Sequence, residues 1–186
     1  MTQKNEVLIV IDMLKGFLDK GPLADPSIRQ IIPENVKLIK SFLSEDKPVL
    51  SFQDAHDADA LEFENYPSHC LKGSVESELV DELKVFEDQM IKIEKNTTNG
   101  FFAPDFQRFL TQSPNLSKIT VTGCCTDICV MNFAITMKTY CQTIQKPITI
   151  VVVEKAVDTF GLPGHDKLTT HQSALGMMRG AGILIQ

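Results

Sequence analysis

The sequence predicts a single α/β domain spanning residues 1–186, with a mostly parallel six-stranded sheet and helices on both faces. Short apolar runs of strand length alternate along the chain with longer segments whose apolar residues recur at helical spacing. Such alternation is typical of a parallel sheet, because each crossover helix packs back onto a face of the sheet. The apolar runs are also continuous, as expected for strands that are covered on both faces.

Three of the expected strands lie in the first half of the chain, at residues 7–11, 48–52 and 90–93. Between the first two, a loop rich in glycine and proline leads to Pro33, which opens a helix with one apolar face. Residues 57–74 are expected to form a long loop, and a loop of that length in a small domain usually has a function. A short helix is expected at residues 76–85.

The second half is expected to contain a helix at 104–111, strands at 119–122, 148–153 and 183–185, and a last helix at 165–179. Gly123 ends the β-branched strand 119–122. A helical pattern begins at Thr126, with Thr126 or Asp127 as the N-cap, so Cys129 would lie in the first turn. The positive end of the helix dipole would favour its thiolate. The plainer alternative is that Cys129 is a small buried apolar residue.

Composition excludes several classes of function. A net charge of −6 without any basic run argues against nucleic acid as a partner. We expect no membrane partner and no signal peptide, because the apolar runs are short and the N-terminus is polar. The odd number of cysteines, five, indicates free thiols in the cytoplasm. The sequence therefore predicts a cytoplasmic protein that acts on a small molecule, and it leaves a homo-oligomer open.

Polar or reactive residues follow four of the expected strands. They are Asp12 after the first strand, Asp54 and His56 after the second, Lys95 after the third and Cys129 after the fourth. The carboxyl ends of parallel strands meet at one edge of a sheet, where ligands bind. We therefore expect these side chains to share one site. Taken singly, Asp12 would pass for a turn or cap residue, and Lys95 for a solvated surface lysine.

The long loop adds further groups that bind metal ions. Asp54 and His56 are alternate residues at an extended strand end, so they can face one divalent cation. His69 is a candidate third ligand, and Glu62 or Glu64 a candidate carboxylate ligand. This mixed nitrogen and oxygen set suits Zn²⁺, Fe²⁺ or Mn²⁺. The alternative is that these are loop residues bonded to the backbone.

Asp12, Lys95 and Cys129 together offer a carboxylate, a cation and a thiol. An aspartate with a raised pKa, or in close contact with the thiol, can take its proton. The cation would favour the ionised form of both neighbours. His165 and His171 near the last helix are rival candidates for the base.

Five segments together resemble the nicotinamidase/pyrazinamidase branch of the isochorismatase-like cysteine hydrolases, and the match runs across nearly the whole chain. They are Ile11-Asp12 with Phe17 five residues beyond the aspartate, Asp54-x-His56, Tyr66-Pro-x-His69-Cys70, Lys95 with Asn99-Gly100-Phe101, and Gly123-Cys-Cys-Thr-Asp-Ile-Cys129-Val130. The last segment is the most specific, because the family pattern reads Gly-x-x-Thr-Asp-x-Cys-Val. The resemblance also implies a Rossmann-like, three-layer fold on a six-stranded sheet.

The resemblance implies that Cys129 is the nucleophile, Asp12 the general base and then acid, and Lys95 the third member of a catalytic triad. It also implies a cis peptide bond between Cys124 and Cys125. The backbone N–H groups of Cys125 and Cys129 would then form an oxyanion hole.

By the same resemblance, Asp54, His56 and His69 match metal ligands, Glu62 falls at the fourth position, and Glu64 stays open. One divalent metal ion is implied, zinc first and iron or manganese otherwise, which would bind the pyridine nitrogen of nicotinamide. Phe17 and Tyr66 match aromatic residues that stack on the pyridine ring.

The implied reaction is metal-assisted hydrolysis of nicotinamide to nicotinate and ammonia through a thioester, a step of NAD salvage, with pyrazinamide as a further substrate. One alternative is a related hydrolase that acts on another small amide, ureide or carbamoyl compound. A second alternative is a non-catalytic binding or redox-responsive protein, in which Cys124, Cys125 and Cys129 form a thiol cluster.

Overall fold

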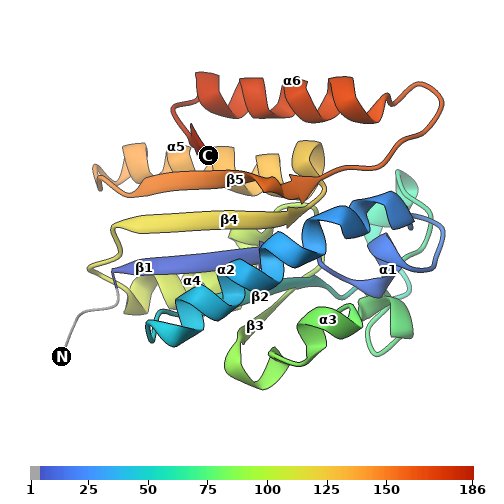
Figure 1. The fold of residues 1–186 in the computed structure, drawn as a ribbon, viewed down its shortest axis with the longest axis horizontal. Coiled ribbons are helices and arrows are strands. Elements are labelled where there is room, and N and C mark those ends of the chain that lie inside the picture. The colour runs from blue at the N-terminus through green and yellow to red at the C-terminus, as the bar shows by residue number, and fades with distance from the viewer. Residues whose placement is uncertain (1–4) are drawn as a thin grey trace.

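The computed structural model describes residues 5–186, and these contain the six-stranded parallel sheet that the sequence predicts (Figure 1). The strands are β1 Glu6–Ile11, β2 Val49–Asp54, β3 Ile91–Lys95, β4 Lys118–Cys124, β5 Thr149–Asp158 and β6 Leu184–Ile185. The helices are α1 Lys15–Leu18, α2 Ile32–Ser44, α3 Asp81–Lys84, α4 Pro104–Gln112, α5 Met131–Thr143 and α6 Lys167–Gly180. Each pair of neighbouring strands in the sheet is parallel, which confirms the predicted fold class.

The strand order β3-β2-β1-β4-β5-β6 places β1 in the middle of the sheet. The chain builds outward from β1 to β3 in one direction and then returns to the other side of β1 with β4. The order therefore reverses between β1 and β4, and ligands of open parallel sheets bind outside the strand ends at such a point. Asp12 follows β1 at this reversal, and Cys124 ends β4 there.

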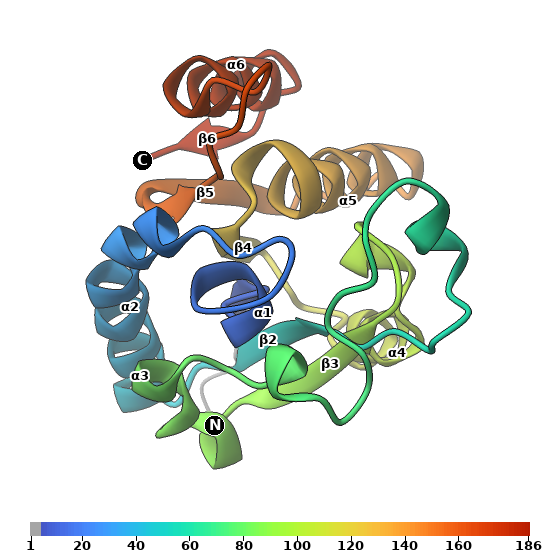
Figure 2. The same cartoon turned by 90° about the vertical axis from the view of Figure 1, so that its right-hand side faces the viewer.

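Helices cover both faces of the sheet, so the molecule has three layers (Figure 2). In β1, Val7, Ile9 and Ile11 are buried in one apolar cluster, with residues of α4, α5 and α6. Leu8 and Val10 point the other way, into a second cluster with residues of α2. The period of two along β1 thus supplies both cores, which explains why the strand reads as a continuous apolar run.

Three expected elements differ from the structure. The helix expected at 76–85 is interrupted, because Leu79 pairs with Leu14 and the N–H of Val80 donates to Met13; only Val75–Ser77 (a 3₁₀ turn) and α3 are helical. The fifth strand extends to Asp158, because a register shift against β4 inserts extra residues into β5. The loop before α2 contains α1 and a 3₁₀ helix, Pro26–Ile31.

Among the described residues, no helix is both long enough and apolar enough to cross a membrane.

Candidate active site

Asp12 lies directly after β1, buried, with a positive φ of 51°. Its N–H donates to the carbonyl of Phe52 (3.0 Å), and its Oδ1 accepts from the N–H of Asp54 (3.2 Å). Gly123 on the neighbouring strand has a φ of +106°, and a Cβ there would lie 1.9 Å from the carbonyl oxygen of Ile11. Only glycine therefore lets β4 approach β1 so closely beside Asp12.

Lys95, at the end of β3, joins the other polar residues of the site. Its Nζ lies 2.7 Å from Asp12 Oδ2, 2.5 Å from Asp54 Oδ1 and 3.7 Å from Cys129 Sγ. All four residues are at least 93% buried, with exposed fractions of 0%, 1%, 4% and 7% for Asp12, Asp54, Lys95 and Cys129. Burial alone would lower the pKa of Lys95, but the carboxylates of Asp12 and Asp54 outweigh it and hold the pKa well above its usual value.

The carboxyl group of Asp12 has a pKa raised to about 7, first because it is buried and then because the Asp54 carboxylate is near, although Lys95 opposes both effects. Burial also raises the pKa of the Cys129 thiol well above its usual value, and the nearby Lys95 only partly offsets this. The resting thiol therefore keeps its proton. The helix terminus that the sequence predicts to favour the thiolate does not stand alone, because burial favours the neutral thiol more strongly than the nearby Lys95 favours the anion. A base is needed, and Asp12 is the nearby candidate, because Lys95 Nζ contacts both Asp12 Oδ2 and Cys129 Sγ.

Cys129 lies in a π-helical turn, Thr126–Val130, that leads into α5. The peptide bond between Cys124 and Cys125 is cis, as the resemblance implied. The carbonyl of Cys125 accepts hydrogen bonds from the N–H groups of Ile128 (3.1 Å) and Val130 (3.1 Å). Within the described residues it receives none from Cys129, which lies between them. The N–H of Cys129 therefore does not bond to this carbonyl.

Neither Thr126 nor Asp127 caps this turn, so that expectation is wrong; Cys125 occupies the cap position without a side-chain bond. Both side chains are engaged elsewhere. The Oγ1 of Thr126 lies 2.9 Å from Nδ1 of His171, and Asp127 Oδ2 lies 2.9 Å from Nε2 of His165. The two histidines proposed as rival bases therefore contact the residues before Cys129, whereas Asp12 contacts Lys95, whose Nζ lies 3.7 Å from the Cys129 sulfur.

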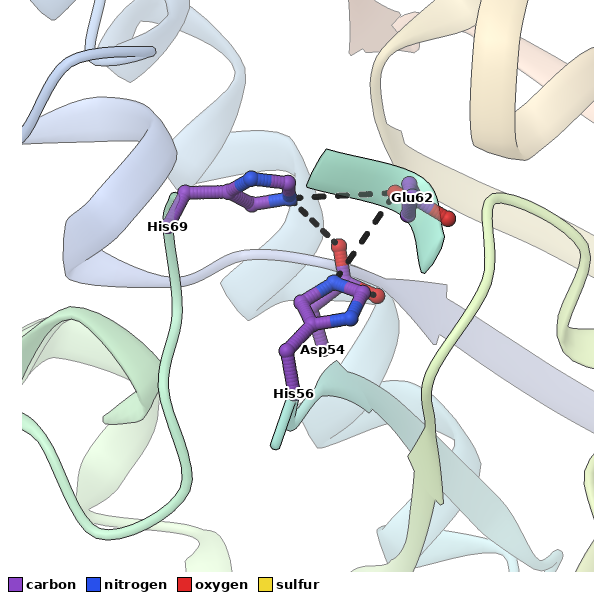
Figure 3. A group of neighbouring side chains, drawn as sticks. All are labelled: Asp54, His56, Glu62 and His69. Carbon is purple, nitrogen blue, oxygen red and sulfur yellow. Dashed lines mark ion pairs between the residues drawn. The ribbon is translucent and has the colours of Figure 1, made fainter. Parts of the chain in front are cut away.

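Asp54, His56, Glu62 and His69 converge on one point beside the triad (Figure 3). Nε2 of His56 lies 3.6 Å from Asp54 Oδ1 and 3.8 Å from Glu62 Oε1. Nε2 of His69 lies 3.7 Å from Asp54 Oδ2 and 3.8 Å from Glu62 Oε1. One atom from each residue lies within 4.8 Å of all the others. Glu64, the alternative ligand, is exposed and outside this group.

The donor chemistry of this group fits a divalent cation. Nδ1 of His69 lies 2.8 Å from the carbonyl of Pro67, so it carries the proton and leaves Nε2 with a lone pair facing the group. His56 is 1% exposed, and within the described structure neither of its ring nitrogens has a hydrogen-bond partner. A buried polar atom without a partner is costly, and coordination would remove that cost. Burial, and then the Asp54 charge, raise the pKa of Glu62.

A cavity of about 470 Å³ opens beside both groups. Cys129 lines it together with His69, and so do the two aromatic residues that the sequence proposed, Phe17 and Tyr66. The ring centroid of His69 lies 5.6 Å from that of Phe17 and 6.3 Å from that of Tyr66. The cavity has the size of a small-molecule site and combines flat apolar walls with a few polar groups.

Sequence reasoning missed several residues of the site. The ring centroid of Phe63 lies 5.2 Å from that of His56 and 5.6 Å from that of His69. Phe63 therefore packs against the candidate metal ligands. Its only sequence signal is its place beside Glu62 in the long loop. The cavity walls at residues 22–26 and 160–162 lie in stretches that the sequence marks as loops rich in glycine and proline, and tertiary contacts bring them to the cavity.

A family model described as the isochorismatase domain matches residues 6–184. Nicotinamidase 1 of Arabidopsis thaliana is 30% identical over 202 residues, which cover 94% of this chain and 82% of the plant protein. The solved structure of a Bacillus subtilis nicotinamidase is similar with a TM-score of 0.82 and 25% identity, covering 97% of this chain and 98% of that one. The solved structure of an N-carbamoylsarcosine amidase from Thermoplasma acidophilum is similar with a TM-score of 0.80 and 25% identity, covering 97% of this chain and 95% of that one.

These similarities agree with the geometry of the site, since the family match spans the strands that carry Asp12, Asp54 and Lys95 as well as the turn of Cys129. The chain belongs to the isochorismatase family and is a nicotinamidase-like hydrolase.

Proposed function

We propose that this protein hydrolyses nicotinamide to nicotinate and ammonia through a thioester at Cys129. The observation that carries the proposal is the double role of Asp54. One of its carboxylate oxygens lies 2.5 Å from Lys95 Nζ, next to the thiol, while the carboxylate also faces His56 and His69. A nucleophile with a candidate base and a candidate metal site thus meet at one cavity.

In the proposed acylation, Asp12 accepts the proton of the Cys129 thiol, and the sulfur attacks the carboxamide carbon. The N–H groups of Cys125 and Cys129 stabilise the oxyanion. The C–N bond then breaks, and Asp12 returns its proton to the departing nitrogen, which leaves as ammonia. Lys95 keeps Asp12 oriented toward the thiol through their 2.7 Å ion pair.

In the proposed deacylation, Asp12 accepts a proton from water as the water oxygen attacks the thioester carbon. The C–S bond breaks, the proton from Asp12 returns to the sulfur, and the product leaves as nicotinic acid, which gives its proton to the solvent and becomes nicotinate. The enzyme is thereby restored with its thiol protonated, which is the resting state that burial favours.

Asp54, His56, Glu62 and His69 would hold one divalent metal ion, and their mixed nitrogen and oxygen donors favour zinc, with iron or manganese as alternatives. Such an ion supplies a Lewis acid that can bind the pyridine nitrogen. Phe17 and Tyr66 would then hold the ring flat in the cavity. Pyrazinamide, which presents a ring nitrogen at the same place, is proposed as a further substrate.

The test is release of ammonia from nicotinamide by the purified protein, with and without a chelator. We expect release that the chelator suppresses and that added zinc restores. Failure to release ammonia in the presence of zinc would overturn the proposal. The five free cysteines fit a reducing compartment, so we place this reaction in the cytoplasm, within NAD salvage.

A second candidate is hydrolysis of another small amide, ureide or carbamoyl compound. The observation that favours it is the similarity to an N-carbamoylsarcosine amidase. Metal analysis of active protein separates the two candidates. Activity on a carbamoyl compound but not on nicotinamide, by protein free of metal, would favour the second.

A further inference from the structure

A second group of bonded side chains lies beside the cavity and takes no part in the proposed chemistry. It consists of Asp127, Thr159 and His165. Oδ1 of Asp127 accepts a hydrogen bond from the hydroxyl of Thr159, and Oδ2 lies 2.9 Å from Nε2 of His165. Asp127 is two residues before Cys129, so this group ties the loop after β5 to the turn that carries the thiol.

Phe160 belongs to that loop and lines the cavity. The ring of His165 stacks on it almost face to face, with the centroids 4.0 Å apart and the planes 10° from parallel. The imidazole thus covers one face of a residue that lines the cavity with Cys129, while His165 itself does not line it. A phenyl face at this place suits a flat aromatic ligand more than a polar or aliphatic one.

The hydrogen bonds of His165 fix the orientation of its ring. Nδ1 lies 3.1 Å from the carbonyl oxygen of Phe160, and Nε2 lies 2.9 Å from the carboxylate of Asp127. The two contacts, on opposite sides of the imidazole, hold its plane against the phenyl ring of Phe160.

The segment before α2 also contacts this loop, through Asp25 and Ser27. Gly161 donates its N–H to Oδ2 of Asp25 (3.0 Å), and Asp25 also lines the cavity. Nζ of Lys167 lies 2.6 Å from Asp158 Oδ2 and 2.7 Å from the hydroxyl of Ser27. The loop is thus fixed on both sides of Phe160, which gives the ring a defined position although the loop lies at the surface.

We propose that Phe160 is a specificity-determining residue whose ring contacts the aromatic ring of the amide substrate, and that His165, held by Asp127, positions it. This inference rests on the proposed function and extends it, because it assigns recognition of the aromatic ring to Phe160, which is not one of the candidate metal ligands. His165 is then a positioning residue, in contrast to the base that its sequence position suggested.

The test compares the variants Phe160→Ala and His165→Ala and the double variant, by nicotinamide turnover and by the Kd of nicotinate, all with zinc present. We expect Phe160→Ala to raise KM and Kd about twofold to tenfold, the range of one aromatic pair, with kcat changed less than about twofold. Phe160→Leu serves where the alanine variant does not fold. Phe102→Ala is the control, since Phe102 is 66% exposed and away from the cavity.

His165→Ala is expected to raise KM as well, but to add no further increase in the Phe160→Ala background. If wild-type protein turns over nicotinamide and Phe160→Ala has the same KM and Kd, Phe160 does not contact the substrate ring. That result would leave the proposed function standing. Equal effects of His165→Ala in both backgrounds would overturn its positioning role. Absence of nicotinamide turnover by wild-type protein would overturn the proposed function, and this inference with it.

Discussion

Replacing Lys95 by methionine is expected to destabilise the protein far more than the same change at Lys92, although both lysines lie on β3. Lys95 Nζ is buried between Asp12 Oδ2 (2.7 Å) and Asp54 Oδ1 (2.5 Å), with 1% of its side chain exposed. Lys92 Nζ lies 2.8 Å from Glu94, with 50% of its side chain exposed. The ion-pair distances are similar, so the two sites differ chiefly in burial.

The magnitude follows from what each substitution leaves behind. At an effective dielectric constant of about 20, each pair of Lys95 corresponds to about 6 kcal/mol, much of it offset by desolvation. Removing the ammonium leaves two carboxylates buried without a counter-charge, and breaking such a pair costs about 3–5 kcal/mol. Removing an exposed partner such as Lys92 costs about 1 kcal/mol or less. For a chain of this size, the cost at Lys95 corresponds to a loss in Tm of about 6–20 °C, and the cost at Lys92 to a loss of at most about 4 °C.

Thermal unfolding followed by circular dichroism measures the difference. The buffer should contain a chelator, because a metal bound to Asp54 would stabilise the folded state and mask part of the effect. The reasoning is refuted if Lys95→Met and Lys92→Met melt at the same temperature. That result would mean that the buried carboxylates do not depend on Lys95 for their charge balance.

Three further predictions follow from single contacts. Glu62→Gln is expected to weaken zinc binding at least about tenfold by competition with a chromophoric chelator, while the exposed Glu64→Gln leaves it unchanged; equal effects would argue against Glu62 as a ligand. Gly123→Ala is expected to yield little soluble protein or a markedly lower Tm, because its Cβ would lie 1.9 Å from the Ile11 carbonyl oxygen; a wild-type melting curve would contradict the close approach. Chelation followed by addition of Zn²⁺ is expected to raise the Tm of wild-type protein but not of His56→Ala, and a rise in both would place the metal elsewhere.

The fold class was predictable because strand and helix periods are local properties of the sequence. The continuous apolar run of β1 predicts a strand covered on both faces. The expected strand ends in turn predict that Asp12, Asp54, Lys95 and Cys129 lie at one edge of the sheet. The interruption after Ser77 was not predictable, because it arises when Leu79 pairs with Leu14, far away in the chain.

Charge states and cavity walls were the least accessible part of the site. The sequence placed Cys129 near a helix terminus, but the desolvation that keeps its thiol protonated depends on groups that fold around it. Phe160 and Asp25 likewise meet the cavity only through tertiary contacts. The residue types of the site could be inferred, whereas the burial that sets their charge states could not.

The most direct test of the central claim is ammonia release from nicotinamide by the Cys129→Ala protein in the presence of zinc. The control is Cys141→Ala, which removes another buried free thiol, on α5 and outside the cavity. The account predicts no release above the uncatalysed rate for Cys129→Ala and near wild-type release for Cys141→Ala. Full activity in the Cys129→Ala protein would contradict a thioester at this residue.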